Sequence, residues 1–381
     1  MRRLSIATAL LLGACSLSDT TKTPSVAAPG AAERSRAEPD WVGFSTGTST
    51  VKSLAIQDDL LWIGLTDGLI RYDTRTDNVH EAYTPASTKG GLMAKGIYVI
   101  GVDGKGTKWI GTYGGGLTRF DGQMWRTFTV ADGLADAWVY DVVFDPQGKM
   151  WVATWKGVSV FDNGAVVKNY TEADGLADKW VYAIARDRQG IFWFGTESGV
   201  SRFDGTRFTT YTHKDGLGAE IANAPPPSNE ALSALPSSTP GAGGGYSSDE
   251  VMQHHMKAGK TNIGPNPNFV ISAVTDRDDA KWFGTWGAGI SRFDGKTWKT
   301  YTQNDGLGGN YIQRVTIDAD GRIWAGTNGG ASWYENGRWR TLTRKDGLID
   351  DNVFAIAFDP KGRRWFGTYK GLSMFKGRLP S

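Results

Sequence analysis

Cysteine, histidine and long apolar runs are scarce in this chain of 381 residues. The one cysteine, Cys15, cannot form a disulfide within the chain, and four histidines offer little material for a histidine-rich metal or acid–base site. The 42 basic and 40 acidic residues nearly cancel, so no strongly charged surface indicates binding to nucleic acid or to an anionic membrane. The sequence therefore predicts no cofactor, no metal site and no nucleic-acid partner.

The first residues have the pattern of an export signal. Arg2 and Arg3 precede an apolar run over residues 4–12, which is shorter than the roughly 20 residues that span a bilayer. Residues 12–15 read Leu-Gly-Ala-Cys, which resembles the lipobox of bacterial lipoproteins. The resemblance implies a signal peptide over residues 1–14 and Cys15 as the lipidated, palmitate-bearing residue. The alternative is ordinary signal cleavage, with Cys15 incidental.

Residues 15–38 are rich in Ser, Thr, Ala and Pro, and this composition predicts a flexible tether after the lipidated cysteine. Ser16, rather than aspartate, follows the cysteine, and in lipoproteins this implies sorting to the outer membrane. We therefore expect an exported protein, lipid-anchored in the bacterial envelope and facing the periplasm.

A Trp-x-Gly-Thr motif, or a close variant, recurs along the rest of the chain at intervals of about 42 residues. Short apolar runs bounded by Asp-Gly, Asn-Gly or Pro turns predict four antiparallel strands in each repeat. Seven four-stranded sheets around an axis make an all-β, seven-bladed β-propeller. The seven copies begin at Trp62, Trp109, Trp151, Trp193, Trp282, Trp324 and Trp365.

The seventh repeat has only three of its four strands, and the missing one is found at the other end of the domain. Trp41-x-x-Phe44 matches the fourth strand of other repeats, such as Trp125-x-x-Phe128. Residues 40–46 are therefore predicted to complete the last blade and close the ring, within a single domain over residues 39–377. Residues 218–267 form an insertion between blades four and five and are predicted to be a flexible loop.

The repeat pattern resembles a known family. Asp-Gly-Leu, then Asp-x-x-Gly-x-x-Trp-x-Gly-Thr, then Gly-[Leu/Val/Ile]-Ser-Arg-Phe-Asp-Gly is similar to the two-component regulator propeller repeat, found in periplasmic sensor regions of bacterial hybrid histidine kinases and in smaller exported proteins. The resemblance implies the propeller fold. It implies signal transduction less directly, because no kinase pattern follows the repeats.

Two positions in each repeat are predicted to meet at the mouth of the central channel: the residue after the motif threonine and the first residue of the innermost strand, which we place at Val51 in the first repeat. Aromatic rings at a concave mouth suit sugar rings or an apolar partner segment. The alternative is that they pack against neighbouring loops and seal the ring. Eight of these fourteen residues are aromatic, the candidate ligand-binding residues Tyr113, Trp138, Trp155, Trp180, Phe269, Trp286, Tyr311 and Tyr369.

Two other recurrent motifs are expected to serve the fold. In Asp132-Gly133-Leu134 and its copies, Asp-Gly makes a turn and Leu fills the crevice between blades. Asp145 and its counterparts begin Asp-x-x-Gly turns. Asp318-Ala-Asp320-Gly321 has some likeness to a calcium loop, but it lacks the further oxygen ligands of such a site.

These patterns favour a non-catalytic, monomeric propeller that binds a glycan or an envelope protein through its aromatic face, as a sensory or accessory component. One alternative is a lyase or hydrolase acting on a polysaccharide, with acid–base roles for two of Asp136, Asp178 and Glu197. No recurrent site position holds a histidine, which makes catalysis the less favoured interpretation. Another alternative is a structural scaffold in an outer-membrane assembly.

Overall fold

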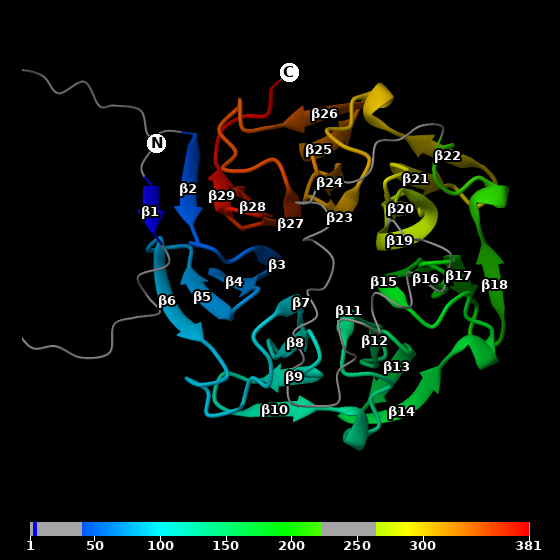
Figure 1. Cartoon of the computed structure of the whole chain (residues 1–381), viewed down its shortest axis with the longest axis horizontal. Coiled ribbons are helices and arrows are strands. Elements are labelled where there is room, and N and C mark those ends of the chain that lie inside the picture. The colour runs from blue at the N-terminus through cyan, green and yellow to red at the C-terminus, as the bar shows by residue number, and fades with distance from the viewer. Residues whose placement is uncertain (1–2, 6–39, 222–263, 381) are drawn as a thin grey trace, which may run out of the picture.

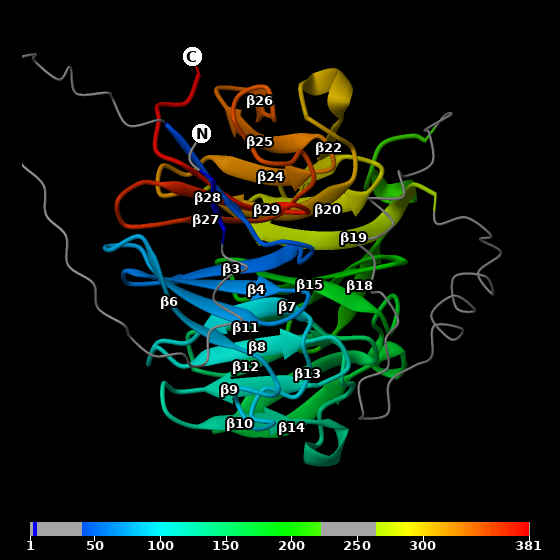
Figure 2. The ribbon, with the colours of Figure 1, turned by 60° about the vertical axis from the view of Figure 1, so that its left-hand side comes forward.

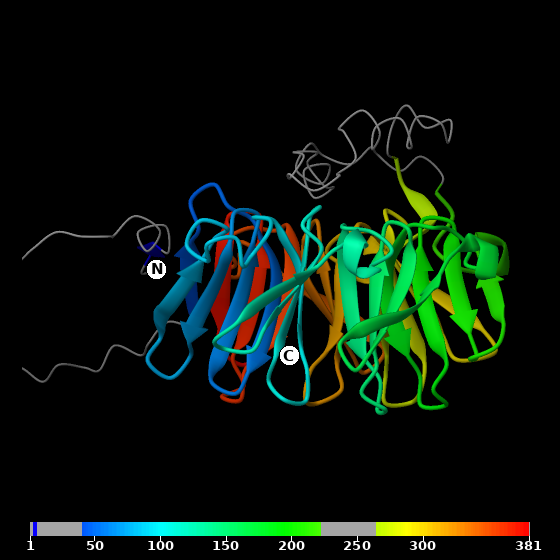
Figure 3. The ribbon, with the colours of Figure 1, turned by 90° about the horizontal axis from the view of Figure 1, so that it is seen from below.

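The computed structural model describes residues 3–5, 40–221 and 264–380. Seven sheets stand around a central axis (Figure 1), and seen edge-on their strands run across the thickness of a disc (Figure 3). The predicted all-β, seven-bladed propeller is confirmed. Cys15, the tether over residues 15–38 and residues 222–263 of the insertion lie outside the described residues.

Blades 1 to 4 are four-stranded antiparallel sheets, and each is built from one continuous stretch of chain. From the axis outward, their strands are β3 (Val51–Gln57), β4 (Leu60–Leu65), β5 (Leu69–Asp73) and β6 (Asn78–Tyr83); β7 (Ile97–Val102), β8 (Lys108–Thr112), β9 (Leu117–Phe120) and β10 (Trp125–Phe128); β11 (Val139–Phe144), β12 (Met150–Thr154), β13 (Gly157–Asp162) and β14 (Ala165–Tyr170); β15 (Val181–Arg186), β16 (Phe192–Thr196), β17 (Gly199–Phe203) and β18 (Phe208–Tyr211).

Blades 5 and 6 repeat this plan, whereas blade 7 takes its outer strand from the start of the domain. The strands are β19 (Asn266–Thr275), β20 (Lys281–Trp286), β21 (Ile290–Phe293) and β22 (Trp298–Tyr301); β23 (Ile312–Ile317), β24 (Ile323–Thr327), β25 (Gly330–Glu335) and β26 (Arg338–Leu342); β27 (Val353–Phe358), β28 (Arg364–Thr368), β29 (Gly371–Phe375) and β2 (Trp41–Ser45).

The ring closes as the sequence predicts. β2 pairs antiparallel with β29 from Trp41 opposite Phe375 to Ser45 opposite Gly371, and Figure 2 shows the two strands together. Each innermost strand also contacts the innermost strand of the next blade, and β27 contacts β3. The structure adds β1 (Arg3–Ser5), a short strand inside the predicted signal peptide, parallel to the outer side of β2.

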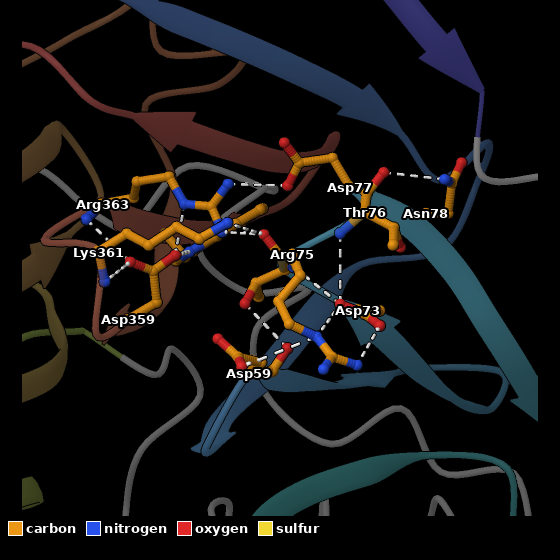
Figure 4. A network of polar contacts seen from close by, with 11 residues as sticks. Asp59, Asp73, Arg75, Thr76, Asp77, Asn78, Asp359, Lys361 and Arg363 are labelled. Carbon is orange, nitrogen blue, oxygen red and sulfur yellow. Dashed lines mark hydrogen bonds and ion pairs between the residues drawn. The ribbon is translucent and has the colours of Figure 1, made fainter.

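A buried polar network joins the last blade to the first on the side of the turns between first and second strands (Figure 4). Arg363 donates to the carbonyl of Thr74 at 2.6 Å, to Asp77 at 2.7 Å and to Asp359 at 2.5 Å. Lys361 donates to the same Thr74 carbonyl at 2.9 Å. These hydrogen bonds link blade 7 to blade 1, where the ring closes.

The tryptophans of the repeat motif are held by the Asp-x-x-Gly turns. Asp145 shows the pattern: one carboxylate oxygen accepts the backbone N–H of Gln147 and Lys149, and the other accepts the indole N–H of Trp151 at 3.2 Å. Six blades share this bond, with distances of 2.7–3.2 Å. The structural role expected for these turns is confirmed. In blade 1 the strand register places Gln57 where Asp145 stands in blade 3, and the buried indole nitrogen of Trp62 has no hydrogen-bond partner among the described residues.

Candidate functional site

Five of the connections between blades are Thr-x-x-Asp-Gly-Leu turns. They lie on one face of the disc, here named the upper face, which also carries the loops between second and third strands. In the turn between blades 2 and 3, the Thr129 N–H donates to Asp132 at 2.9 Å, and Gly133 has φ of 95°. A residue with a side chain is strained at that φ, so glycine is required. Leu134 is buried between the two blades. The structural interpretation of this motif is confirmed.

The aspartate that follows each of these turns in blades 3, 4 and 7 orients the start of the innermost strand. Asp136 accepts the N–H of Trp138 at 2.9 Å, and Asp178 accepts that of Trp180 at 2.9 Å. The second oxygen of Asp136 pairs with Lys156 at 3.7 Å, and that of Asp178 accepts from Ser198 at 2.7 Å. These carboxylates therefore position the tryptophans.

Glu197, the third acid considered for catalysis, accepts a hydrogen bond from the hydroxyl of Tyr182 at 3.1 Å. All three acids that the enzyme interpretation requires thus have structural partners on the upper face. The described residues also contain no group of three or more His, Cys, Asp or Glu arranged to hold a metal ion.

The structure brings most of the predicted binding residues together in one buried cluster on the upper face. Six of the eight belong to it, and none of these six exposes more than 6% of its surface. Tyr113 is half-buried against the cluster, and Tyr369 is half-buried outside it. We name the whole group the aromatic cluster: Trp138, Tyr140, Trp155, Trp180, Tyr182, Phe269, Trp286 and Tyr311, with Tyr98, Tyr113 and Ile271 at its edge.

The rings of the aromatic cluster are packed on one another. Trp155 lies between Trp138 and Trp180, with centroids 4.6 and 4.7 Å apart and planes 7° and 5° from parallel. Tyr113 meets Trp138 edge-on at 5.3 Å, and on the far side Trp286 meets Tyr311 edge-on at 5.0 Å. Packing between neighbouring loops therefore accounts for the burial of these rings. That they also bind a ligand stays a prediction.

Polar atoms of the aromatic cluster that are buried without a hydrogen-bond partner in the described part of the chain include the indole nitrogen of Trp138 and the hydroxyl oxygens of Tyr140 and Tyr311. Most buried polar atoms are hydrogen-bonded, since an unmet donor costs about 1–3 kcal/mol. The clustering of three such atoms at the upper face indicates donors available to a bound molecule.

A second group of residues was not identified from the sequence. Each innermost strand contains a β-bulge, and the extra residue of each bulge lies at the wall of the central cavity. Bulges re-aim side chains in this way. We name these seven residues, one from each blade, the channel ring: Lys52, Tyr98, Tyr140, Tyr182, Ile271, Gln313 and Phe354.

The pairing of the innermost strands also corrects the residue predicted at the channel mouth in blade 1. Val51 pairs with Leu65 as Val139 pairs with Thr154, so Thr50, not Val51, is the blade 1 counterpart of Trp138. In the sequence, each residue of the channel ring stands two positions after the residue that corresponds to Trp138. Tyrosine stands there in blades 2, 3 and 4, but a bulge cannot be recognised from alternation alone.

The channel cavity is small, and its two sides are lined by different kinds of residue. Its volume is about 40 Å³. Tyr98, Tyr140, Tyr182 and Ile271, from blades 2 to 5, form one wall. Blades 6 and 1 contribute polar and charged groups to the other, and blade 7 contributes apolar ones. Burial lowers the pKa of Lys52 to about 7 and raises that of Tyr98 to about 12. A cavity of this size holds water or a small ion but not a sugar ring.

Three segments of the chain match the model of a known protein family. Residues 133–156, 175–198 and 306–329 match the family model of the two component regulator propeller. The repeat type recognised from the sequence is thereby confirmed in three of the seven copies. Comparison with curated protein sequences gave no match.

Several solved structures share the fold. The extracellular domain of a hybrid two component system from B. thetaiotaomicron is 21% identical over 90% of this chain and 42% of its own, with a TM-score of 0.67. The extracellular domain of a one component system from the same organism is 17% identical over 89% of this chain and 40% of its own, with a TM-score of 0.60. This chain thus spans about two fifths of these two structures. Virginiamycin B lyase from Staphylococcus aureus is 14% identical over 89% of this chain and 98% of its own, with a TM-score of 0.59.

Proposed function

Because the chain carries two component regulator propeller repeats, we propose that it is a non-catalytic binding protein of the bacterial envelope that recognises a glycan through its upper face. It is exported, anchored through a lipid on Cys15 and held in the periplasm at the outer membrane, where it acts as a sensory or accessory component. The observation that carries the proposal is the pair of unpartnered donors, Trp138 and Tyr311, within the aromatic cluster.

The chemistry of the upper face fits a neutral, hydroxyl-rich ligand. Sugar hydroxyls and ring oxygens accept hydrogen bonds from indole N–H and phenol O–H groups, while aromatic rings cover the apolar faces of the sugar. Of the acids on the upper face, Asp136 pairs with Lys156 and Asp350 with Lys370 at 3.3 Å. Asp178 and Glu197 accept hydrogen bonds from the hydroxyls of Ser198 and Tyr182. A ligand therefore meets acids that already have partners, together with hydrogen-bond donors and aromatic rings.

Access to the Trp138 donor is governed by a neighbouring glycine. A Cβ at Gly114 would lie 3.5 Å from the indole nitrogen of Trp138, and the φ of Gly114 is +72°. Gly115 and Gly116 follow it in the loop between β8 and β9. The absence of side chains keeps this side of the N–H clear. We expect the ligand oxygen to approach along this loop.

Binding to a printed glycan array, followed by calorimetric titration of the best glycan, tests the proposal. Trp138→Phe and Tyr311→Phe each remove one donor and keep an aromatic ring. We expect each to weaken binding about fivefold or more, the effect of losing one hydrogen bond. Trp333→Phe is the matched control, because it removes a buried unpartnered indole N–H from β25, outside the aromatic cluster.

Equal affinity in all three variants and the wild type would place the ligand elsewhere, and a wild-type protein that binds no glycan would remove the proposed ligand class. Loss of glycan on incubation would instead favour the polysaccharide enzyme. The anchor is tested separately: incorporation of labelled palmitate in cells should be lost in Cys15→Ser and kept in Ser16→Ala.

A further inference from the structure

The channel cavity beneath the aromatic cluster is lined by basic side chains and, within the described part of the chain, by no acidic one. Arg314 and Lys52 line it, from blades 6 and 1, and none of the described residues that line it is Asp or Glu. Arg314 has no ion pair or hydrogen bond to the described residues. Lys52 is half-buried, with its ammonium nitrogen 3.9 Å from the centroid of the Phe354 ring. A cavity with this lining attracts anions.

A buried carboxylate of blade 3, Asp141, interacts with the charge of Arg314 but has its own backbone partners. The oxygens of Asp141 accept the backbone N–H of Val142 at 3.0 Å and, across the blade boundary, that of Ile184 at 2.9 Å. Burial raises the pKa of Asp141, and the charge of Arg314 opposes this rise, so the guanidinium acts across the channel. Asp141 is committed to joining blades 3 and 4.

A third group in the channel is a donor with no acceptor. The hydroxyl of Tyr140 is buried, faces the same cavity and has no partner in the described residues. A phenol O–H in the same cavity as two basic side chains suits an anion, because hydrogen bonds to an ionised acceptor are about twice as strong as neutral ones. The roughly 40 Å³ of space suits a group the size of a carboxylate.

We propose that the central channel binds a carboxylate group, held by Arg314, Lys52 and Tyr140. The site rests on the channel residues alone and does not depend on glycan binding at the upper face. The carboxylate has two possible sources: a free small acid, or an acidic sugar whose ring stays above in the aromatic cluster while its carboxylate enters the channel. Both supply the same charged group to the same three side chains.

Calorimetric titration in HEPES buffer without added chloride tests this site. Acetate, D-glucuronate and neutral D-glucose are each added to the wild type and to Arg314→Met, Tyr140→Phe and Arg126→Met. Arg126 is the matched control, an exposed arginine on β10 that lies over Phe128. We expect Arg314→Met to weaken carboxylate binding about tenfold or more, as loss of a charge-assisted hydrogen bond does, and Tyr140→Phe to weaken it less.

The outcomes separate the two sources. Equal binding of acetate and glucuronate indicates a site for a free carboxylate. Tighter binding of glucuronate, with the advantage lost in Trp138→Phe, indicates an acidic sugar. The proposal is overturned if neither carboxylate binds the wild type, if glucose binds as tightly as glucuronate, or if Arg314→Met binds carboxylates as the wild type does. Circular dichroism of each variant shows whether its fold is kept, and Tyr140→Phe tests the site if Arg314→Met does not fold.

Discussion

The indole ring of Trp155 stacks on that of Trp138, with centroids 4.6 Å apart and planes 7° from parallel. Because Trp180 covers the other face of Trp155, the central ring of the stack contacts two blades at once. The stack therefore stabilises the junction between blades 3 and 4 as well as shaping the upper face.

Removing the central ring should be costly. We expect Trp155→Ala to lower the free energy of unfolding by about 3–5 kcal/mol, since it leaves a large cavity between two indoles. Tyr369→Ala is the control, because Tyr369 holds the same position in blade 7 but is only half-buried and lies outside the cluster; its cost should stay below about 1 kcal/mol. Urea unfolding followed by circular dichroism measures both. Equal losses of unfolding free energy in the two variants would show that the stacking of Trp155 adds no stability.

The seam between the first and last blades gives a second prediction. Arg363 is 8% exposed and joins Asp359 to Asp77 and Thr74 across the closure. Arg363→Met leaves Asp359 buried without its cation, so we expect a loss of about 3–5 kcal/mol. Arg75 pairs with Asp73 in the same region but is 64% exposed, and Arg75→Met should cost no more than about 1 kcal/mol. Chemical denaturation measures the free energy of unfolding of both variants. Equal losses would show that the Arg363 network does not stabilise the closure of the ring.

The indole bonds of the repeat predict an asymmetry between blades. Trp324 donates to Asp318 at 2.9 Å, whereas the N–H of Trp62 has no hydrogen-bond partner in the described part of the chain, although both rings are buried. Replacing each with Phe removes nearly the same ring, but only Trp324→Phe removes a hydrogen bond. Asp318 keeps Arg322, which donates to the same carboxylate oxygen at 3.3 Å. We therefore expect Trp324→Phe to cost about 0.5–1.5 kcal/mol more than Trp62→Phe, the net contribution of one hydrogen bond. Identical unfolding midpoints for the two variants would contradict the role given to these aspartates.

Much of the fold could be predicted because the sequence repeats it seven times. Trp41 and Phe44 identified the closing strand, since they match the outer strands of other blades, and β2 pairs with β29 as expected. Asp132-Gly133-Leu134 was correctly assigned to a turn and a buried plug. In both cases the residue type follows from a local need, a positive φ or a crevice to fill, which one sequence can display.

The site was less predictable for two physical reasons. A single extra residue in a strand moves the following side chains to the opposite face, so the bulge hid Tyr140. Val51 was misplaced by one residue in blade 1, where the turn before the motif tryptophan is one residue shorter than in blade 3. Trp138 and Trp155 were placed correctly at the mouth, but their burial depends on loops of adjacent blades meeting in space. Spacing along the chain does not report that distance.

The buried ammonium of the channel should make stability depend on pH. Lys52 titrates at about 7 in the folded protein, because burial disfavours its charge, and at its ordinary 10.5 when unfolded. Below pH 7 both states hold the proton, and the folded state bears the full cost of the buried charge. Between pH 7 and 10.5 only the unfolded chain holds it, so the contribution of Lys52 to stability improves as pH rises.

Comparison with Lys52→Met isolates this effect. Arg314, Asp141 and the channel tyrosines are present in both proteins, and burial keeps the pKa values of Tyr98, Tyr140 and Tyr182 above their usual range, so these hydroxyls stay protonated. We expect Lys52→Met to be the more stable protein at pH 6, with the difference in melting temperature shrinking steadily towards pH 9.5. A difference that stays constant with pH would show that Lys52 remains charged in the folded protein. Acetate should move the change to higher pH, because a carboxylate beside Lys52 favours its charged form.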